Sequence, residues 1–592
     1  MPIYPRVSPQ FTQQVLTDSF GGYDHRLKIP DGEFYDTKNL TTDHAPMLAN
    51  RRPRGDLKRG AVALAEKKSL AYVGTDGTLY FNFLPTGLTG LSPGEKQLVS
   101  MGAYLVVFPD KKYINTEELS DYGSLEAHYS AQSAAYRMVR WDGTAVNASH
   151  IQAAAPAEPA NGEYWIDTSG ETHVLRQWSD AQADWLSVET VYIKISFPTL
   201  GTIPALFSEA DGVTISGSSI DEVNGEKVIC ALGGRAAGAN DAGEADWIMV
   251  TGLLGQAVTD GGLSIDRSVP SPDHVCECQN RLWGCRYGMA DGQTVNEIFC
   301  CALGDFKNWR QYQGLSTDSW TGSVGSDGPW TGAVNYLGYP TFFKENRIHR
   351  VTISTEGAHR IDETVCRGVQ KGSAKSLVVV NETLYYKSGS DVCAYQGGFP
   401  TGISAALGDA AYHDAAAGAV GGKYYISMLD ENNAASLFVY DIAKGVWIRE
   451  DELRVTAFAR VDNELFAVAS NGLRTMLGSL CGVSGAEKES GMTWEAVTGV
   501  QYYELPENKR VSRYNVRMKM ARGARMEAFV QYDSDGVWRS AGSVTAGSAG
   551  TDSYLFPIRP HRCDHLQLKL SGSGDVRIFS IAKILEVGSD YR

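Results

Sequence analysis

Long hydrophobic runs are missing from this 592-residue sequence. No stretch approaches the roughly 20 apolar residues that a membrane-spanning helix requires, so we expect no membrane-spanning segment. The first residues, MPIYPRVSPQFTQQ, lack a basic region followed by an apolar core, which argues against a signal peptide. A chain of this length exceeds what one hydrophobic core supports, so two to four domains are expected.

Cysteine is also scarce, with ten residues in the chain. This is too few for a disulfide framework, so we expect reduced thiols made in a cytoplasm. Five cysteines lie close together, but none of them forms the Cys-x-x-Cys pair that zinc sites favour. We predict that they are small buried core residues, with a metal site as the minor alternative. The five are Cys276, Cys278, Cys285, Cys300 and Cys301.

Basic residues are too few for a general nucleic-acid binder. The chain has 54 Lys and Arg against 69 Asp and Glu, a net charge of −15, whereas phosphate binding needs a basic face. A surface that nucleic acid merely passes is still compatible with this charge. The exception is NRRPRGDLKRG at 50–60, which is either a solvated loop or a docking site for an acidic partner subunit or a phosphate backbone. The candidate docking residues are Arg51, Arg52, Arg54, Lys58 and Arg59.

Catalytic and nucleotide-binding motifs are absent from the sequence. It has no HExxH, no Walker-type glycine loop and no G-x-S-x-G elbow. The stretches GSDGPW (325–330) and YDSDGVW (532–538) resemble the Asp-turn-Trp hairpins of sialidase blades, but Asp-Gly turn chemistry alone explains them. A glycosidase also needs two facing carboxylates, and the sequence singles out no such pair. We therefore nominate no catalytic, cofactor-binding or metal-ligating residue, expect no cofactor, and predict that the protein is not an enzyme.

What the chain does contain is glycine and tyrosine, 63 and 29 residues respectively. This combination favours many short strands joined by tight turns. In SLFVYDIAKGVWIRED (436–451), two strand-like runs flank a short break, and the second run is centred on Trp447. We predict that Trp447 lies on the outer hairpin of one blade and wedges against the neighbouring blade. Similar units of about 35–50 residues recur, which is the period expected of propeller blades. We predict an all-β protein with a β-propeller built from discontinuous segments, the alternative being a tandem of irregular sandwiches.

The propeller pattern is interrupted and then followed by other β-modules. The interruption holds a Trp-rich module, whose Trp165, Trp178 and Trp185 either form its core or stack on sugars, and then a compact barrel. The end of the chain alternates regularly and predicts a β-sandwich. One short helix is expected within 115–139. The predicted domains are an N-terminal arm with first strands (1–66), propeller blades (67–139), the Trp-rich module (140–200), the barrel (201–272), further blades (273–478) and the sandwich (479–592).

The stretch FGGYDHRLKIPDGEFYDTKNLTTDHAPMLANRRPRG, residues 20–55, resembles the opening of a family of tailed-phage and prophage structural proteins. It has a Gly-Gly turn, a Pro-Asp-Gly-Glu turn, and then NL followed by P.L..R. The segments NRLWGCRYG (280–288), NEIFCCALGDFKNW (296–309) and GYPTFFKENRIHRV (338–351) are similar to the same group. The chain is thus similar to the propeller-bearing tail nozzle, or tail tubular, proteins of short-tailed phages.

This resemblance implies a virion protein of the phage tail, assembled in the host cytoplasm. It implies a homo-oligomeric, hexameric ring below the portal and adaptor, which retains and conducts phage DNA without binding it specifically. It also implies a platform for tail fibre proteins. A glycan-binding receptor-recognition protein of the phage tail is the alternative function, and a glycosidase is the third.

Overall fold

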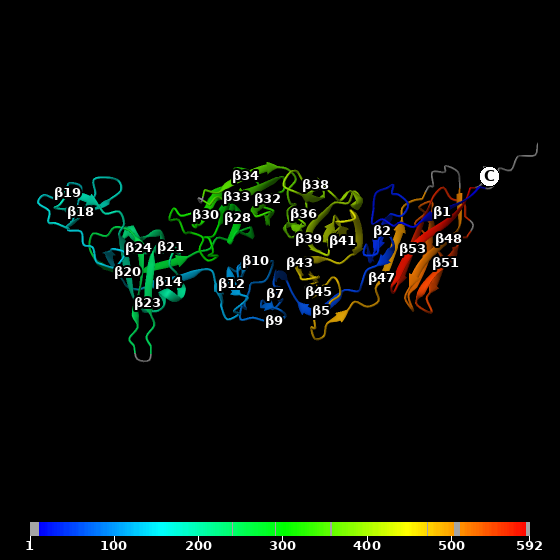
Figure 1. Ribbon diagram of the computed structural model, residues 1–592, viewed down its shortest axis with the longest axis horizontal. Helices are drawn as coiled ribbons and strands as arrows, with labels where there is room; N and C mark the ends of the chain where they lie inside the picture. Colours follow the sequence, from blue (N-terminus) through cyan, green and yellow to red (C-terminus); the bar gives the residue numbers. More distant parts are fainter. Residues whose placement is uncertain are drawn as a thin grey trace, which may run out of the picture.

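The computed structural model describes residues 11–587, apart from 239–240, 291, 356–357, 471, 502–508 and 560. The molecule is elongated, with a propeller in the middle, a β-sandwich at one end and an inserted domain at the other (Figure 1). The fold is nearly all β, which confirms the predicted fold class. In the described part of the chain, none of the helices has the length and apolar character of a membrane span. These helices are α1 (Ile203–Leu206) and the 3₁₀ helices η1 (Asp221–Val223), η2 (Ala374–Ser376) and η3 (Ala405–Leu407).

Seven small antiparallel sheets form the blades of the propeller. The first strand of each blade packs against the first strand, or the turn before it, of the next, and the seventh returns to the first. Blades 1 to 4 are β6 (Ala63–Lys67), β7 (Ser69–Val73), β8 (Leu79–Phe81), β9 (Leu84–Pro85); β10 (Gln97–Met101), β11 (Tyr104–Phe108), β12 (Lys112–Asn115), β13 (Tyr122–Ser124); β27 (His274–Cys278), β28 (Arg281–Ala290), β29 (Gln293–Cys300), β30 (Trp320–Ser323); and β31 (Gly332–Tyr336), β32 (Tyr339–Lys344), β33 (Arg347–Thr352), β34 (Arg360–Val365).

The last blade is completed by a strand from the N-terminal part of the chain. β5 pairs with β45, with Gly55 opposite Thr475, so the two ends of the propeller sequence are joined within one sheet. Blades 5 to 7 are β35 (Val378–Val380), β36 (Thr383–Lys387), β37 (Val392–Tyr395), β38 (Thr401–Gly402); β39 (Tyr412–Val420), β40 (Lys423–Asp430), β41 (Ala435–Asp441), β42 (Val446–Asp451); and β43 (Val455–Val461), β44 (Glu464–Ala469), β45 (Gly472–Thr475), β5 (Gly55–Gly60), β46 (Glu487–Lys488).

Hydrophobic packing in the propeller lies between blades rather than within them. Each of the seven blade interfaces holds its own cluster of buried side chains. At the interface of blades 5 and 6, Trp447 on β42 is buried, and its indole Nε1 donates to the carbonyl of Ile403, 2.7 Å away, after β38. The prediction that Trp447 lies on an outer hairpin and wedges against the neighbouring blade is confirmed.

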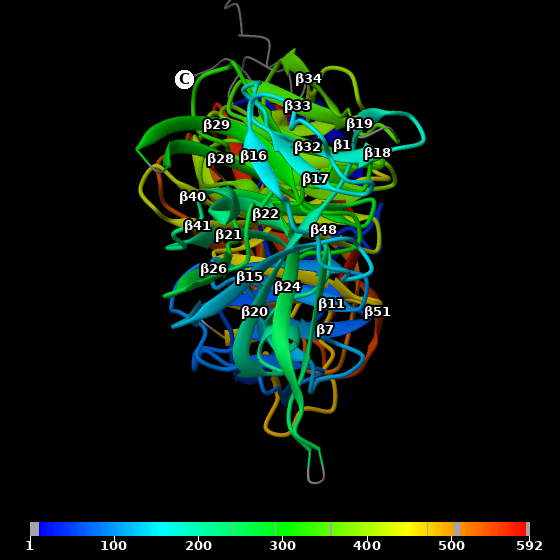
Figure 2. The same cartoon turned by 90° about the vertical axis from the view of Figure 1, so that its left-hand side faces the viewer.

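The insert between blades 2 and 3 is a two-sheet barrel-like domain with a smaller sheet nested in it (Figure 2). We call these parts the insert barrel and the Trp module. One buried cluster spans both sheets of the insert barrel. Its strands are β14 (Ala127–Ala131), β26 (Leu263–Arg267), β21 (Gly212–Ser216), β22 (Gly225–Val228), and β23 (Ala231–Arg235), β24 (Glu244–Thr251), β20 (Tyr192–Leu200), β15 (Ala134–Val139), β25 (Val258–Asp260); the Trp module has β16 (His150–Gln152), β17 (Tyr164–Asp167), β18 (Val174–Ser179), β19 (Asp184–Ser187).

Two details of this region differ from the sequence-based expectation. Residues 127–139, expected among the blades, form β14 and β15 and pair with β26 and β20 of the insert barrel. The helix expected within 115–139 is replaced by β13, β14 and β15, because tertiary pairing outweighs local propensity. The Trp module and barrel are therefore nested, and do not follow each other along the chain as expected.

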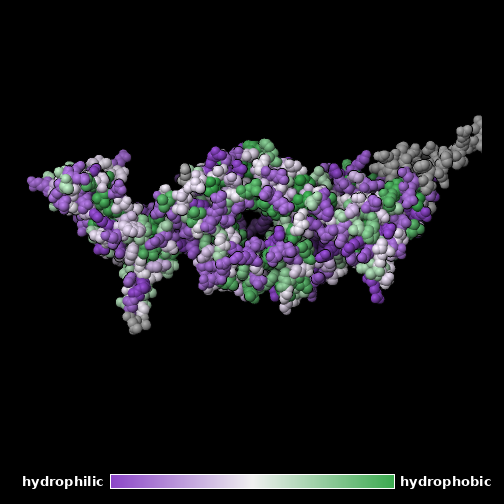
Figure 3. Space-filling model, viewed as in Figure 1, coloured by the Kyte–Doolittle hydropathy of each residue, from purple (hydrophilic) through white to green (hydrophobic). Residues whose placement is uncertain are grey.

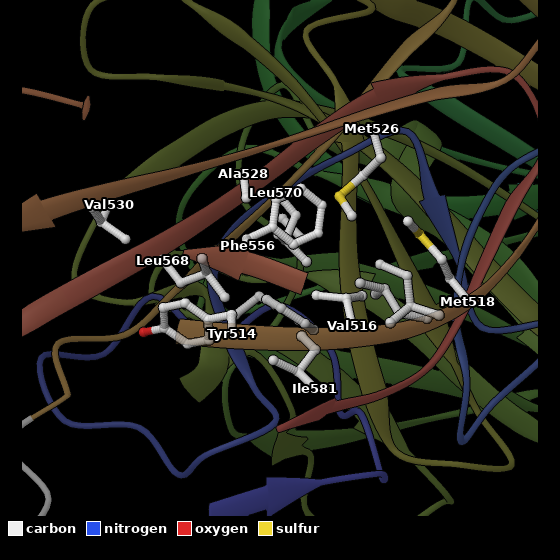
Figure 4. Packing of buried hydrophobic residues seen from close by; sticks show 14 of the residues in the cluster. Tyr514, Val516, Met518, Met526, Ala528, Val530, Phe556, Leu568, Leu570 and Ile581 are labelled. Carbon is white, nitrogen blue, oxygen red and sulfur yellow. The ribbon is translucent and has the colours of Figure 1, made fainter. Parts of the chain in front are cut away.

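The sandwich at the other end of the molecule combines strands from both ends of the chain. Alternate residues of β48 point inward, so Tyr514, Val516 and Met518 meet Met526 and Leu570 of the facing sheet (Figure 4). The first sheet has β1 (Phe11–Thr17), β3 (Leu40–Thr41), β4 (Leu48–Asn50), β53 (Val576–Val587), β48 (Lys509–Met520) and β51 (Gly550–Pro557); the second has β2 (Phe34–Lys38), β47 (Thr493–Thr498), β52 (Leu566–Ser573), β49 (Arg525–Tyr532) and β50 (Arg539–Thr545).

Candidate functional site

A cavity of about 800 Å³ lies on the axis of the propeller, where the space-filling view shows a dark hollow (Figure 3). The first strands of the blades and the loops before them form its wall, in which alanine, glycine and valine recur. Small residues are needed where seven strands converge. A methyl group on Gly418 of β39, for example, would come within 2.6 Å of Phe458 Cβ on the neighbouring blade. Ala63, Ala333, Ala417, Ala419 and Ala457 also line the cavity.

The charged groups around this cavity are mixed in sign. Glu95 and Lys375 form an ion pair, with Oε1 and Nζ 2.9 Å apart, although they belong to the non-neighbouring blades 2 and 5. Burial raises the pKa of Asp273 and lowers that of His274, so burial disfavours the charged form of both groups. The cavity therefore has the size and polarity for a small ligand. It does not admit duplex DNA, because the Glu95–Lys375 ion pair joins opposite sides of the cavity.

The segment GSDGPW lies beside the most catalysis-like cluster of side chains. Ser326 Oγ and Glu363 Oε2 lie 2.9 and 3.0 Å from His349, but both contact the same ring nitrogen, Nε2. His349 Nδ1 is buried without a partner among the described residues. A nucleophile relay needs the serine and the carboxylate on opposite nitrogens. This cluster therefore joins blades 3 and 4 and has no relay geometry.

Two of the five candidate docking cations are not available to a partner. Arg51 and Arg54 are each only 4% exposed. Arg54 Nη1 lies 2.6 Å from Asp451 Oδ2, and Arg51 Nη1 lies 2.8 Å from Glu489 Oε2. Burial opposes ionisation of Asp451, yet the two guanidinium groups hold its pKa below the ordinary value. The prediction of docking is thus wrong for Arg51 and Arg54, which instead join the N-terminal part of the chain to blade 6 and to the entry of the sandwich.

The other three cations are exposed. Lys58 forms an ion pair with Asp56, 2.9 Å away, on the rim of blade 7. Arg52 and Arg59 have no ion-pair partner within the described ranges. Docking through Arg52, Lys58 and Arg59 stays a prediction.

Of the two roles considered for the three tryptophans of the Trp module, core residue or sugar platform, the core fits two of them. Trp165 and Trp185 are 5% and 8% exposed, and their rings meet edge to face with centroids 5.4 Å apart. Trp178 packs on Trp185 in the same way and is half-buried. Trp165 and Trp185 therefore cannot stack on a sugar, because their faces are used inside the Trp module. The sequence analysis missed Trp141, which is exposed at the tip of an Asp-Gly turn.

The five clustered cysteines are all buried, as predicted. Cys300 packs between blades 3 and 4, and Cys301 packs between blades 2 and 3. The two residues are adjacent at the end of β29, so their side chains point to opposite faces of the sheet. Burial raises the pKa of Cys276, Cys285 and Cys301, which keeps these thiols neutral.

No family model and no curated protein matches the sequence. Among solved structures, the chain is similar to a glycoside hydrolase family 43 arabinoxylan arabinofuranohydrolase from Bacillus subtilis, with 11% identity, 52% of this chain and 94% of the other covered, and a TM-score of 0.19. It is also similar to an exo-β-1,3-galactanase from Phanerochaete chrysosporium, with 7% identity, 75% and 97% covered, and a TM-score of 0.18. A third is the Trypanosoma rangeli sialidase, with 8% identity, 90% and 95% covered, and a TM-score of 0.19.

These likenesses correct one expectation. The prediction that the protein is not an enzyme is contradicted by this finding, since the matched structures are glycoside hydrolases and a sialidase, and we withdraw it. Identities of 7–11% carry no activity or substrate over to this chain.

Proposed function

We propose that this protein is a virion structural protein that forms the tail nozzle ring of a short-tailed phage. The ring retains the DNA, conducts it at ejection, and serves as a platform for tail fibres below the portal and adaptor. Subunits are made in the host cytoplasm and function in the virion. The proposal starts from the family resemblance of residues 20–55, and it is supported by what this segment does in the fold.

Residues 20–55, which we call the strap, join the sandwich to the propeller. The backbone N–H of Tyr23 donates to the carbonyl of Trp447 in blade 6, 2.6 Å away, while β2 and β4 complete the two sheets of the sandwich. Arg51 and Arg54 add buried ion pairs to Glu450, Asp451 and Glu489. This double attachment is the observation that carries the proposal, because a pressure-bearing conduit needs subunits whose domains do not swing.

The charge of the chain supports the same function. The insert, residues 127–267, has 18 acidic and 7 basic residues, and the whole chain has a net charge of −15. Acidic surfaces repel phosphates, which suits a wall along which DNA slides. Because the axial cavity of the propeller is too small for a duplex, the DNA passage has to lie between subunits of the ring.

Sizing by light scattering and cryo-EM of purified protein and of phage particles test the proposal. We expect a ring, six subunits being the family expectation, at the tail end of the particle. A matched pair of variants tests the docking cations: Arg52→Glu with Arg59→Glu should shift the ring towards monomers, whereas Lys68→Glu, an exposed cation on the rim of blade 1, should not. A chain that stays monomeric at all concentrations and is missing from particles would contradict the ring.

A further inference from the structure

The sandwich is the basic part of an acidic chain. Residues 509–587 contain 13 basic and 7 acidic residues, whereas the whole chain has a net charge of −15. Part of this excess gathers on the outer face of the first sheet, at the end of the molecule opposite the insert (Figure 1). We call this surface the basic face. Its four cations are Arg513, Arg517 and Lys519, which alternate with buried residues of β48, and Arg577 of β53.

The strand neighbours of these cations on the same face carry no negative charge. The residues beside Arg517 and Lys519 are Ser553, Thr551, Ser580 and Arg577. Lys519 and Arg577 stand directly opposite each other, and like charges in this position destabilise a sheet. The fold itself therefore gains nothing from this pair.

The four cations also have no counter-charge elsewhere in the structure. Within the described residues, none of their side chains has an ion-pair or hydrogen-bond partner. Basic residues just outside the face differ, since Arg510 pairs with Glu586 and Arg525 pairs with Glu527. The basic face thus offers a set of unneutralised donors on a rigid sheet.

The composition of the basic face favours a nucleic-acid backbone over a protein partner. The centre of a protein interface is depleted in charged residues and enriched in aromatic ones. Around Arg517 and Lys519 there are instead cations and hydroxyl groups, the side chains that contact phosphate oxygens. These neighbours include no aromatic ring on which the bases of a single strand could stack. From Arg513 to Lys519 the strand rises about 20 Å, which is about six base pairs of a duplex.

We propose that the basic face holds the phosphate backbone of duplex DNA, without regard to its sequence. The guanidinium groups of Arg513 and Arg517 donate two parallel hydrogen bonds to phosphate oxygens, and Lys519 adds a point charge. The role of this contact rests on the proposed function. In the nozzle, the basic face retains the DNA before ejection, whereas the acidic insert repels it and lets it slide.

The test is fluorescence anisotropy of a labelled duplex of random sequence with the full-length protein, from low to physiological salt. We expect the logarithm of the binding constant to fall with the logarithm of salt concentration with a slope of about −3 to −4, the value for four phosphates. Arg513→Gln with Arg517→Gln and Lys519→Gln should weaken binding at low salt about tenfold or more and reduce the slope by about 3. Lys519→Gln alone should reduce the slope by about 1.

A control variant removes the same charge from the propeller. Lys68→Gln with Lys371→Gln and Arg460→Gln neutralises three exposed cations there, and it should bind as the unchanged protein does. Thermal unfolding should show Lys519→Gln as stable as the unchanged chain or more stable, because it removes the repulsion from Arg577. Equal losses of binding in the triple variant and its control would show a general effect of charge and overturn the inference.

Light scattering on the same samples separates this inference from the ring. A ring that does not bind the duplex at low salt would overturn the basic face as a DNA site and leave the ring standing. A monomer that binds the duplex through the four cations would support the face and contradict the ring. Binding of polyglutamate as tight as that of the duplex would instead assign the face to an acidic protein partner. Tighter binding of single-stranded DNA would overturn the assignment of a duplex.

Discussion

The propeller and the sandwich solve the same problem, covering both faces of a sheet, in different ways. The sandwich has one continuous core between two sheets, and the strands of both sheets contribute side chains to it. The propeller has seven separate cores, and each belongs jointly to two neighbouring blades. No blade is therefore stable by itself, and loss of one interface opens the ring. The sandwich depends mainly on its own packing, to which blade 6 adds Ile448.

The strap is where the two regions depend on each other, and breaking its ion pairs should have the largest effect. Arg54→Ala removes the nearer of two buried counter-charges from Glu450 and Asp451 and leaves only Arg51, 3.8 and 3.4 Å away. We therefore expect the free energy of unfolding to fall by about 3 kcal/mol. Denaturant unfolding of the full chain measures this loss. The exposed neighbour is the control: Arg52→Ala should change stability by no more than about 0.5 kcal/mol. Equal losses in the two variants would show that the buried network does not hold the regions together.

Two buried tryptophans, one in the propeller and one in the sandwich, test how the two regions differ. The expected difference in stability is of intermediate size. Trp447 donates from Nε1 to Ile403, whereas Trp494 in the sandwich is buried with no described partner for its Nε1. Trp447→Phe removes a hydrogen bond and leaves the partly buried carbonyl of Ile403 unpaired, but Trp494→Phe removes an unpaired donor. We expect Trp447→Phe to cost about 1–2 kcal/mol more than Trp494→Phe by denaturant unfolding. A larger cost for Trp494→Phe would contradict this assignment.

The smallest effect is a pH dependence in the strap. Burial, followed by a hydrogen bond and repulsion from Asp24, raises the pKa of Glu33 to about 7. The folded state therefore holds a proton that the unfolded state loses above the ordinary value of 4.5, and this group lowers stability progressively as the pH rises from there to about 7. Glu33→Gln removes this titration. Thermal unfolding should show the variant unchanged near pH 4 and more stable than the unchanged chain at pH 8.

A matched control is available in the same strap, at Asp24. Asp24 has a lowered pKa, since its bonds to Arg26 and Glu33 outweigh burial, so Asp24→Asn should lose stability at pH 8 instead of gaining it. If both variants gain or both lose stability at pH 8, the pKa shifts of Glu33 and Asp24 are not opposite in direction, and the assignment is wrong.

The local sequence pattern predicted the blades because each hairpin has its own short-range pattern of strand and turn residues. The two strands of 436–451 and the alternation in β48 are short-range features, and both formed as expected. Blade number was not predictable, since β9 and β38 are only two residues long and leave no period in the sequence. The burial of Arg51 and Arg54 could not be foreseen either. Their acidic partners lie about 400 residues away, and RRPRG alone has the composition of a solvated loop.

The placement of β5 has a consequence for biogenesis. Its partner β45 is synthesised about 400 residues later, so at roughly 5–20 residues per second the nascent N-terminal strands remain unpaired for roughly 20–80 seconds. During that time, the partly synthesised propeller exposes unpaired strand edges while the chain is still attached to the ribosome. Holdase chaperones that cover these edges would thus raise the yield of correctly folded protein.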